Sequence, residues 1–115
     1  MNTPVAKPQI NRRGVMRRPA RRSIRLECRR GTMGLGANLG SGCLDISVSG
    51  VQLTAKDALK CGEEVEVILE CYGIRGVIRR VGEVRWTIPL ESGGCRAGVR
   101  FSKYLTFRDL QNLSS

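Results

Sequence analysis

The sequence predicts a mainly β protein: a six-stranded antiparallel β-barrel with a flexible N-terminal arm and a short C-terminal helix. Short segments with an apolar residue at every second position run from residue 23 to about residue 101, and glycine-rich turns separate them. In the last segment, near the C-terminus, the apolar residues have the spacing of a helix instead. At 115 residues the chain has the size of one domain. A barrel is favoured because closure removes exposed sheet edges. We therefore expect an arm over residues 1–22 and a barrel with its helix over residues 23–115.

The arm is distinguished by its charge. The first thirty residues hold ten of the twenty lysines and arginines and a single acid, so they carry +9 of the formal net charge of +10. Prolines, a glycine and few apolar side chains accompany these arginines, and such a segment cannot bury enough surface to order itself. A block of positive charge at one end indicates an arm that binds anions.

The first half of the predicted barrel contains three strands. Residues 24–28 alternate apolar and charged side chains, which places the apolar set on one face. Five glycines between residues 31 and 42 predict a long, mobile hairpin connection. Residues 43–47 and 51–53 then form two short strands on either side of a turn at residues 48–50.

The second half contains two long strands, a shorter one and the helix. Over residues 64–70 valines and a leucine alternate with glutamates, which we expect on a solvated face. Over residues 74–86 the apolar positions change face, so a bulge or bend is expected near Arg79 and Arg80 or at Gly82. Residues 95–101 form the last strand. Thr106 and Asp109 have the spacing of a capping box for a helix that ends near Leu113.

Several classes of function have no support in the sequence. No signal peptide or stretch long enough to span a membrane is present, so we expect a cytoplasmic protein without membrane insertion. The five cysteines form no C-x-x-C pair and the chain has no histidine, which argues against a metal site and favours reduced, mostly buried thiols. No nucleophile–base pair is apparent, so we expect neither an enzyme nor a cofactor. Trp86, the only tryptophan, is expected to contact the barrel or the helix in preference to stacking on a base.

Two short patterns carry the predicted binding chemistry. Arg13 and Arg17 form an R-x-x-x-R, and their guanidinium groups suit phosphate oxygens or the O6/N7 edge of guanine. Asp45, Ser47 and Gly50 form a D-x-S-x-x-G. An ionised Asp45 accepts hydrogen bonds and so matches the N1–H and exocyclic amine of guanine, while Ser47 adds a small polar group. Gly50 permits a positive φ and a close approach of ligand to backbone.

The arginine pattern alone leaves alternatives open. Arg17 with Arg21 and Arg18 with Arg22 have the same spacing. Neither pattern is specific by itself, and their order, with one strand between them, makes the combination informative.

With these two patterns the chain resembles the PilZ domain family, the bacterial receptors for cyclic di-GMP. The resemblance covers about residues 11 to 113, and Gly98-Val99-Arg100-Phe101 before the closing helix adds to it. Members of the family place a proline two residues after the second arginine, which Pro19 satisfies for the pair Arg13 and Arg17. The long glycine-rich connection departs from the usual layout by lengthening the chain between the motifs.

The resemblance implies a single-domain, stand-alone receptor. Cyclic di-GMP would be its ligand, held by Arg12, Arg13, Arg17, Asp45, Ser47 and Gly50. In the family an arginine at the position of Arg12 goes with two stacked ligand molecules. Ligand binding would order the arm over the barrel and alter the interaction with a separate, unidentified downstream protein. The alternative function is a small barrel that binds RNA or DNA through its basic arm, but five aromatic residues offer few stacking platforms.

Overall fold

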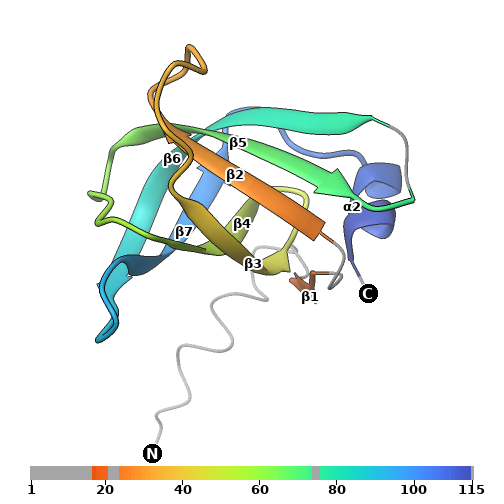
Figure 1. Cartoon of the computed structure of the whole chain (residues 1–115). Helices are drawn as coiled ribbons and strands as arrows, with labels where there is room; N and C mark the ends of the chain where they lie inside the picture. Colours follow the sequence, from red (N-terminus) through yellow and green to blue (C-terminus); the bar gives the residue numbers. More distant parts are fainter. Residues whose placement is uncertain (1–16, 21–23, 74–75, 115) are drawn as a thin grey trace, which may run out of the picture.

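The computed structural model describes residues 17–20, 24–73 and 76–114. In this part of the chain it has seven strands and one short helix, so the prediction of a mainly β protein with a C-terminal helix is confirmed (Figure 1). The elements are β1 (Arg18–Pro19), β2 (Ile24–Arg30), β3 (Gly40–Ile46), β4 (Gly50–Ala55), β5 (Glu64–Cys71), β6 (Val77–Pro89), β7 (Cys95–Phe101) and α2 (Phe107–Leu113).

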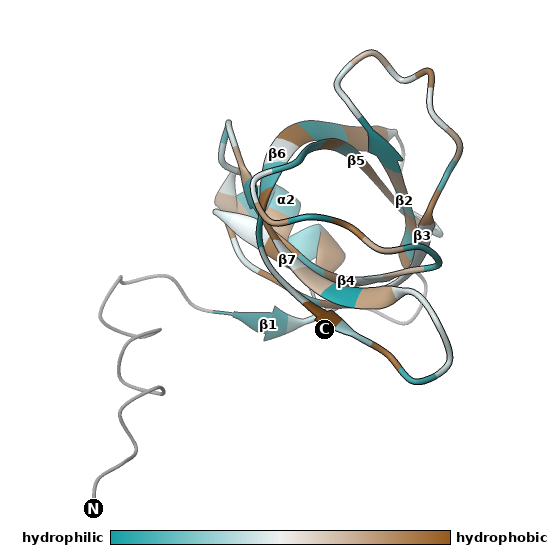
Figure 2. Ribbon diagram, turned by 90° about the vertical axis from the view of Figure 1, so that its left-hand side faces the viewer, coloured by the Kyte–Doolittle hydropathy of each residue, from teal (hydrophilic) through white to brown (hydrophobic). Residues whose placement is uncertain are grey.

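The strands form one antiparallel sheet in the order β1-β3-β4-β7-β6-β5-β2, and it curls into a half-barrel (Figure 2). The prediction of a closed six-stranded barrel is wrong in two details. A seventh strand, β1, lies in the segment assigned to the arm and pairs with β3 through Arg18–Ile46 and Pro19–Asp45. The end strands of the sheet are β1 and β2. The start of β3 crosses β2 at Gly40, where an added Cβ would lie 2.5 Å from Leu26, and Leu39 N–H donates to the Cys28 carbonyl at 2.7 Å.

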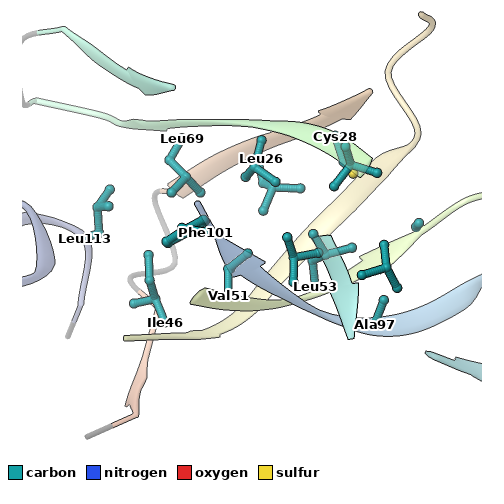
Figure 3. Packing of buried hydrophobic residues seen from close by; sticks show 14 of the residues in the cluster. Leu26, Cys28, Ile46, Val51, Leu53, Leu69, Ala97, Phe101 and Leu113 are labelled. Atoms are coloured by element: carbon teal, nitrogen blue, oxygen red, sulfur yellow. The ribbon is translucent and has the colours of Figure 1, made fainter. Parts of the chain in front are cut away.

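The core fills the inside of the curled sheet, and α2 covers one end of it (Figure 3). The alternation of apolar and polar residues in the sequence produces this core, because every second residue of each strand points inward. Phe101 is the largest of the fully buried side chains. Burying an aliphatic or aromatic side chain of this size contributes about 1.5–3 kcal/mol. The core includes Leu26, Cys28, Ile46, Val51, Leu53, Val65, Val67, Leu69, Val84, Ala97, Val99, Phe101, Leu110 and Leu113.

The glycine-rich connection between β2 and β3 approaches a side chain of the neighbouring strand β5. Gly34 lies above Glu66, with an added Cβ only 3.1 Å from the Glu66 carboxylate, and the Glu66 side chain is 5% exposed. Glu66 Oε2 accepts a hydrogen bond from Arg79 at 2.9 Å. The expectation that every glutamate of this strand is solvated is therefore wrong for Glu66.

The irregularity of β6 lies further along the strand than expected. From Val77 to Val84 its pairing with β5 and β7 runs without a break, and the register shifts between Val84 and Trp86. The bulge predicted near Arg79 or Gly82 is absent from this pairing. One extra residue, Arg85, is inserted instead, and a bulge of this kind redirects the side chains that follow it.

Helix α2 begins as its capping residues predicted. The Thr106 hydroxyl accepts a hydrogen bond from Asp109 N–H at 3.0 Å, and Leu110 and Leu113 are buried. The segment before the helix is tied to the turn after β3, since Leu105 N–H donates to the Val48 carbonyl at 2.8 Å. No helix among the described residues is long and apolar enough to cross a membrane.

All five cysteines lie in the described part of the chain and all are free thiols. Cys28, Cys71 and Cys95 are buried, Cys43 is half-buried and Cys61 is exposed. Burial raises the pKa of Cys28 to about 11. This thiol is therefore neutral at physiological pH and serves as a small apolar group in the core.

Candidate ligand site

The structure brings together one residue from each of the two predicted motifs. Arg17 Nη1 donates a hydrogen bond to Asp45 Oδ1 at 3.0 Å. The pairing of β1 with β3 causes this contact, because it places Pro19 opposite Asp45 and leaves Arg17 at the end of a two-residue strand. The side chains are 37% and 26% exposed. The pair lies at the surface, where a ligand can reach both groups.

Ser47 closes the turn that follows β3. Ser47 is only 1% exposed, and its hydroxyl accepts hydrogen bonds from the backbone N–H groups of Ser49 at 3.3 Å and Gly50 at 3.2 Å. Its N–H donates to the Gly50 carbonyl at 2.9 Å. The Ser49 hydroxyl lies 3.2 Å from that of Ser47. The serine of the D-x-S-x-x-G pattern thus shapes the turn, and Ser49 is the serine of this turn that faces the surface cleft described below.

Gly50 is required for packing between strands. Its φ is not positive, so the positive φ that a glycine permits is not used here. A Cβ at this position would lie 2.2 Å from the Val99 carbonyl oxygen of the neighbouring strand β7. The absence of a side chain lets β4 and β7 approach closely at the turn, and it leaves the surface beside the turn open.

Four residues form a row across the outer face of the sheet. Asp45 of β3 pairs with Gln52 of β4, Gln52 pairs with Gly98 of β7, and Gly98 pairs with Trp86 of β6. Gln52 Nε2 donates a hydrogen bond to Asp45 Oδ2 at 3.0 Å. An added Cβ on Gly98 would lie 2.2 Å from Trp86 Nε1, so the indole lies directly over this glycine. The row therefore places an aromatic ring, an amide and a carboxylate side by side along one direction.

Trp86 lies on the outer face of the sheet and packs on Gly98 of β7, a contact with the barrel of the kind expected for it. The bulge at Arg85 places it there. The Arg96 guanidinium lies 5.7 Å from the centre of the indole ring. A cation at this distance holds the ring by a cation–π contact, and the half-buried indole lines the cleft described next.

A surface cleft of about 570 Å³ opens beside this row, within the range usual for small-molecule sites. Its wall contains three arginines and no carboxylate among the described residues. Arg100 is held by its hydrogen bond to the Tyr104 hydroxyl at 3.1 Å. The cleft suits an anionic ligand that carries a flat ring. It is lined by Arg17, Ser49, Gly50, Arg85, Trp86, Gly98, Val99, Arg100 and Tyr104.

The charge is balanced in the groove next to this cleft. A second, shallower groove of about 800 Å³ shares Arg85, Arg100 and Tyr104 with it but is also lined by Glu64 and Glu83. On β3, near Asp45, burial raises the pKa of the Cys43 thiol to about 12, and the charge of Asp45 raises it further. Cys43 is therefore neutral at physiological pH. In the first cleft, by contrast, the charged residues of the wall are the arginines Arg17, Arg85 and Arg100.

The predicted site residues have different outcomes. Arg17 and Asp45 are in contact, Gly50 lines the cleft, and Ser47 is buried beneath it. Arg12 and Arg13 lie outside the described residues, as do Arg21 and Arg22 of the alternative arginine pairs. The contact with Asp45 favours the pairs that include Arg17.

The comparison with protein-family models decides the classification. The model of the PilZ domain matches residues 11–115, which is nearly the whole chain. The chain belongs to the PilZ domain family. PilZ domains are binding domains, and the family as a whole binds cyclic di-GMP. Neither the curated proteins nor the solved structures gave a match to this chain.

In this PilZ domain the sequence patterns missed part of the cleft. Trp86 in the cleft wall and Gln52 beside the cleft belong to no short motif, because they come from different strands and meet Gly98 only through the pairing of β4, β7 and β6. Arg100 belongs to the segment that contributed to the family resemblance, but its place in the cleft wall follows from the structure. The PilZ domain shows no cluster of three or more metal-binding side chains among its described residues.

Proposed function

We propose that this PilZ domain is a receptor for cyclic di-GMP that binds one guanine in the cleft beside Asp45. The row from Asp45 to Trp86 carries this proposal. A guanine stacked on the Trp86 indole directs its Watson–Crick edge along the sheet toward Gln52 and Asp45. The Asp45 carboxylate accepts hydrogen bonds from N1–H and the exocyclic amine, and adenine lacks this pair of donors.

The phosphates of the ligand face the arginines. Arg17, Arg85 and Arg100 all line the wall of the cleft. Guanidinium groups bind phosphate oxygens in bidentate geometry and remain charged at every relevant pH. Arg17 must leave Asp45 Oδ1 to take up a phosphate, so ligand binding exchanges one charged contact for two. Arg17 is therefore released from Asp45 when guanine forms hydrogen bonds with the Asp45 carboxylate.

We further propose that ligand binding orders the arm. Arg12 and Arg13 precede Arg17 by only a few residues, so pairing with the same phosphates fixes this part of the chain against the barrel. The resulting surface alters binding of a separate effector. Hydrogen exchange of the arm with and without cyclic di-GMP tests this step. We expect slower exchange over residues 10–20 in the presence of ligand, and exchange that is equal in both states would contradict the ordering.

Isothermal titration with cyclic di-GMP tests the receptor function. We expect micromolar binding, with Arg17→Ala and Asp45→Ala each weakening it by about tenfold or more, since hydrogen bonds to charged groups contribute about 1.5–3 kcal/mol. Arg25→Ala is the matched control, because this exposed β2 arginine lies 4.0 Å from Glu70 and outside the cleft. The stoichiometry distinguishes one bound ligand from two stacked ones. No heat at micromolar ligand, or equal effects of all three substitutions, would rule the proposal out.

General binding to RNA or DNA is the competing function, and the net charge of +10 is the observation that favours it. Such binding weakens steeply with salt and does not depend on the dinucleotide. Titration of a single-stranded oligonucleotide at two salt concentrations, with cyclic di-GMP as competitor, separates the two. A cyclic di-GMP receptor should bind the oligonucleotide only weakly. Salt-sensitive binding that persists in excess dinucleotide would support the nucleic-acid function.

A further inference from the structure

Gln52 occupies the centre of the row on the outer face, between Asp45 and Gly98, and belongs to neither motif. Its strand, β4, is paired on both sides, with β3 and with β7. This strand is therefore a fixed part of the sheet. Gln52 is half-buried, and its Nε2 donates to Asp45 Oδ2 at 3.0 Å.

The two oxygens of Asp45 have different partners. Oδ1 accepts from Arg17, which precedes a strand of only two residues, and Oδ2 accepts from Gln52 in the middle of the sheet. A carboxylate has about four positions for accepting hydrogen bonds, so each oxygen keeps at least one position for a ligand. Arg17 is the partner that a ligand can replace, and Gln52 is the partner that stays.

The amide of Gln52 also offers an acceptor. Because Nε2 must face the carboxylate, the orientation of the amide is fixed and Oε1 points away from Asp45 Oδ2. No described residue donates a hydrogen bond to Oε1. Gln52 Oε1, beside the cleft, can therefore accept a hydrogen bond from a ligand donor that is not bonded to the Asp45 carboxylate.

We propose that Gln52 is a specificity-determining residue of the guanine site, an inference that rests on the proposed function. The exocyclic amine of guanine has two hydrogens. Asp45 accepts N1–H and one of these hydrogens, and Gln52 Oε1 accepts the other. Gln52 thus distinguishes guanine from hypoxanthine, which keeps N1–H and O6 but lacks the amine, and it holds the Asp45 carboxylate in the plane that this contact needs.

The test compares cyclic di-GMP with its bis-inosine analogue, in which hypoxanthine replaces guanine. We expect the wild-type protein to prefer cyclic di-GMP by about tenfold or more, because the analogue leaves both acceptors short of a donor. Gln52→Met keeps the length of the side chain but has no amide, and we expect it to reduce this preference about fivefold, the loss of one ordinary hydrogen bond. Thr54→Val, on the same strand but bonded to Ser41, is the control and should keep the wild-type ratio.

The ratio of the two affinities is the decisive quantity, because a merely structural role of Gln52 would weaken both ligands equally. A ratio unchanged in Gln52→Met overturns the inference while the receptor function stands. A wild-type protein that binds neither ligand overturns the proposed function itself. If Gln52→Met does not fold, Gln52→Thr removes the amide with a residue favoured in strands and is tested in the same way.

Discussion

Arg17 of the arm and Asp45 of β3 are joined by a 3.0 Å hydrogen bond between Nη1 and Oδ1. The contact links the two motifs of the sequence across 28 positions and across the long glycine-rich connection between them. The bond holds both side chains at the surface, where Arg17 lines the cleft. A ligand that presents donors to Asp45 and phosphates to Arg17 replaces this contact with two of its own.

The pair should contribute little to folding. Both side chains are partly exposed, and surface ion pairs contribute about 0.2–1 kcal/mol to the free energy of unfolding. A double-mutant cycle with Arg17→Ala and Asp45→Ala, measured by urea denaturation, should give a coupling energy in this range. The variants then remain folded for binding studies. A coupling energy of several kcal/mol would show that the pair is structural and would weaken its assignment to the ligand.

Two glycines should respond differently to alanine. In Gly50→Ala the new Cβ meets the Val99 carbonyl, part of the backbone, and we expect a loss of about 1–3 kcal/mol of unfolding free energy. In Gly98→Ala it meets the Trp86 indole, a side chain that can move. We therefore expect a smaller loss of stability but a shifted tryptophan emission maximum. Denaturation followed by fluorescence measures both, and equal losses without an emission shift would contradict this assignment.

The two serines of the turn should separate stability from binding. Ser47→Ala leaves the N–H groups of Ser49 and Gly50 without their buried acceptor, which costs about 1–3 kcal/mol of stability. Ser49→Ala removes a hydroxyl from the cleft wall and should weaken cyclic di-GMP about fivefold with little change in stability. Thermal denaturation and titration of both variants check this. The opposite pattern, with Ser47→Ala fully stable but defective in binding, would assign the ligand contact to Ser47.

Acid should weaken the fold in part through Glu63. Burial raises its pKa, but the Lys60 backbone N–H and the Arg30 guanidinium outweigh this and lower the pKa of Glu63 below its usual value. A lowered folded-state pKa means that the contribution to stability is complete above the unfolded value of about 4.3 and is lost as the pH falls through the folded value. Between pH 5 and pH 3 the wild-type protein should lose more unfolding free energy than Glu63→Gln, by up to about 1 kcal/mol. Glu91→Gln, in an exposed turn, should follow the wild type, and identical acid profiles for all three proteins would disprove the role of Glu63.

Local patterns were sufficient for most of the elements. Ile24, Leu26 and Cys28 alternate with charged residues and point inward in β2 as predicted, and Thr106 caps α2. These features depend on neighbours in the chain, which a sequence displays directly. The six strands predicted from the alternation all exist, although several begin or end a few residues from the predicted position.

Features that depend on distant parts of the chain could not be predicted in this way. Glu66 alternates like a solvated residue, but Gly34 covers it from a loop that starts in another strand. Trp86 faces the cleft because one residue is inserted in β6, and a single sequence does not show where such a bulge falls. Gly50 is needed because of the Val99 carbonyl, which lies 49 positions away. The candidate site was therefore half predicted: Arg17, Asp45 and Gly50 came from motifs, while Gln52 and Trp86 came from the pairing of strands.

Fluorescence of Trp86 tests the central claim most directly, because it is the only tryptophan in the chain and lies in the wall of the cleft. A purine stacked on the indole changes its emission, so titration with cyclic di-GMP should give a saturable change at micromolar concentration. The same titration of Asp45→Ala should need about tenfold more ligand or more. Calorimetric binding of cyclic di-GMP with no change in Trp86 emission would show that the ligand binds elsewhere and would contradict the site described above.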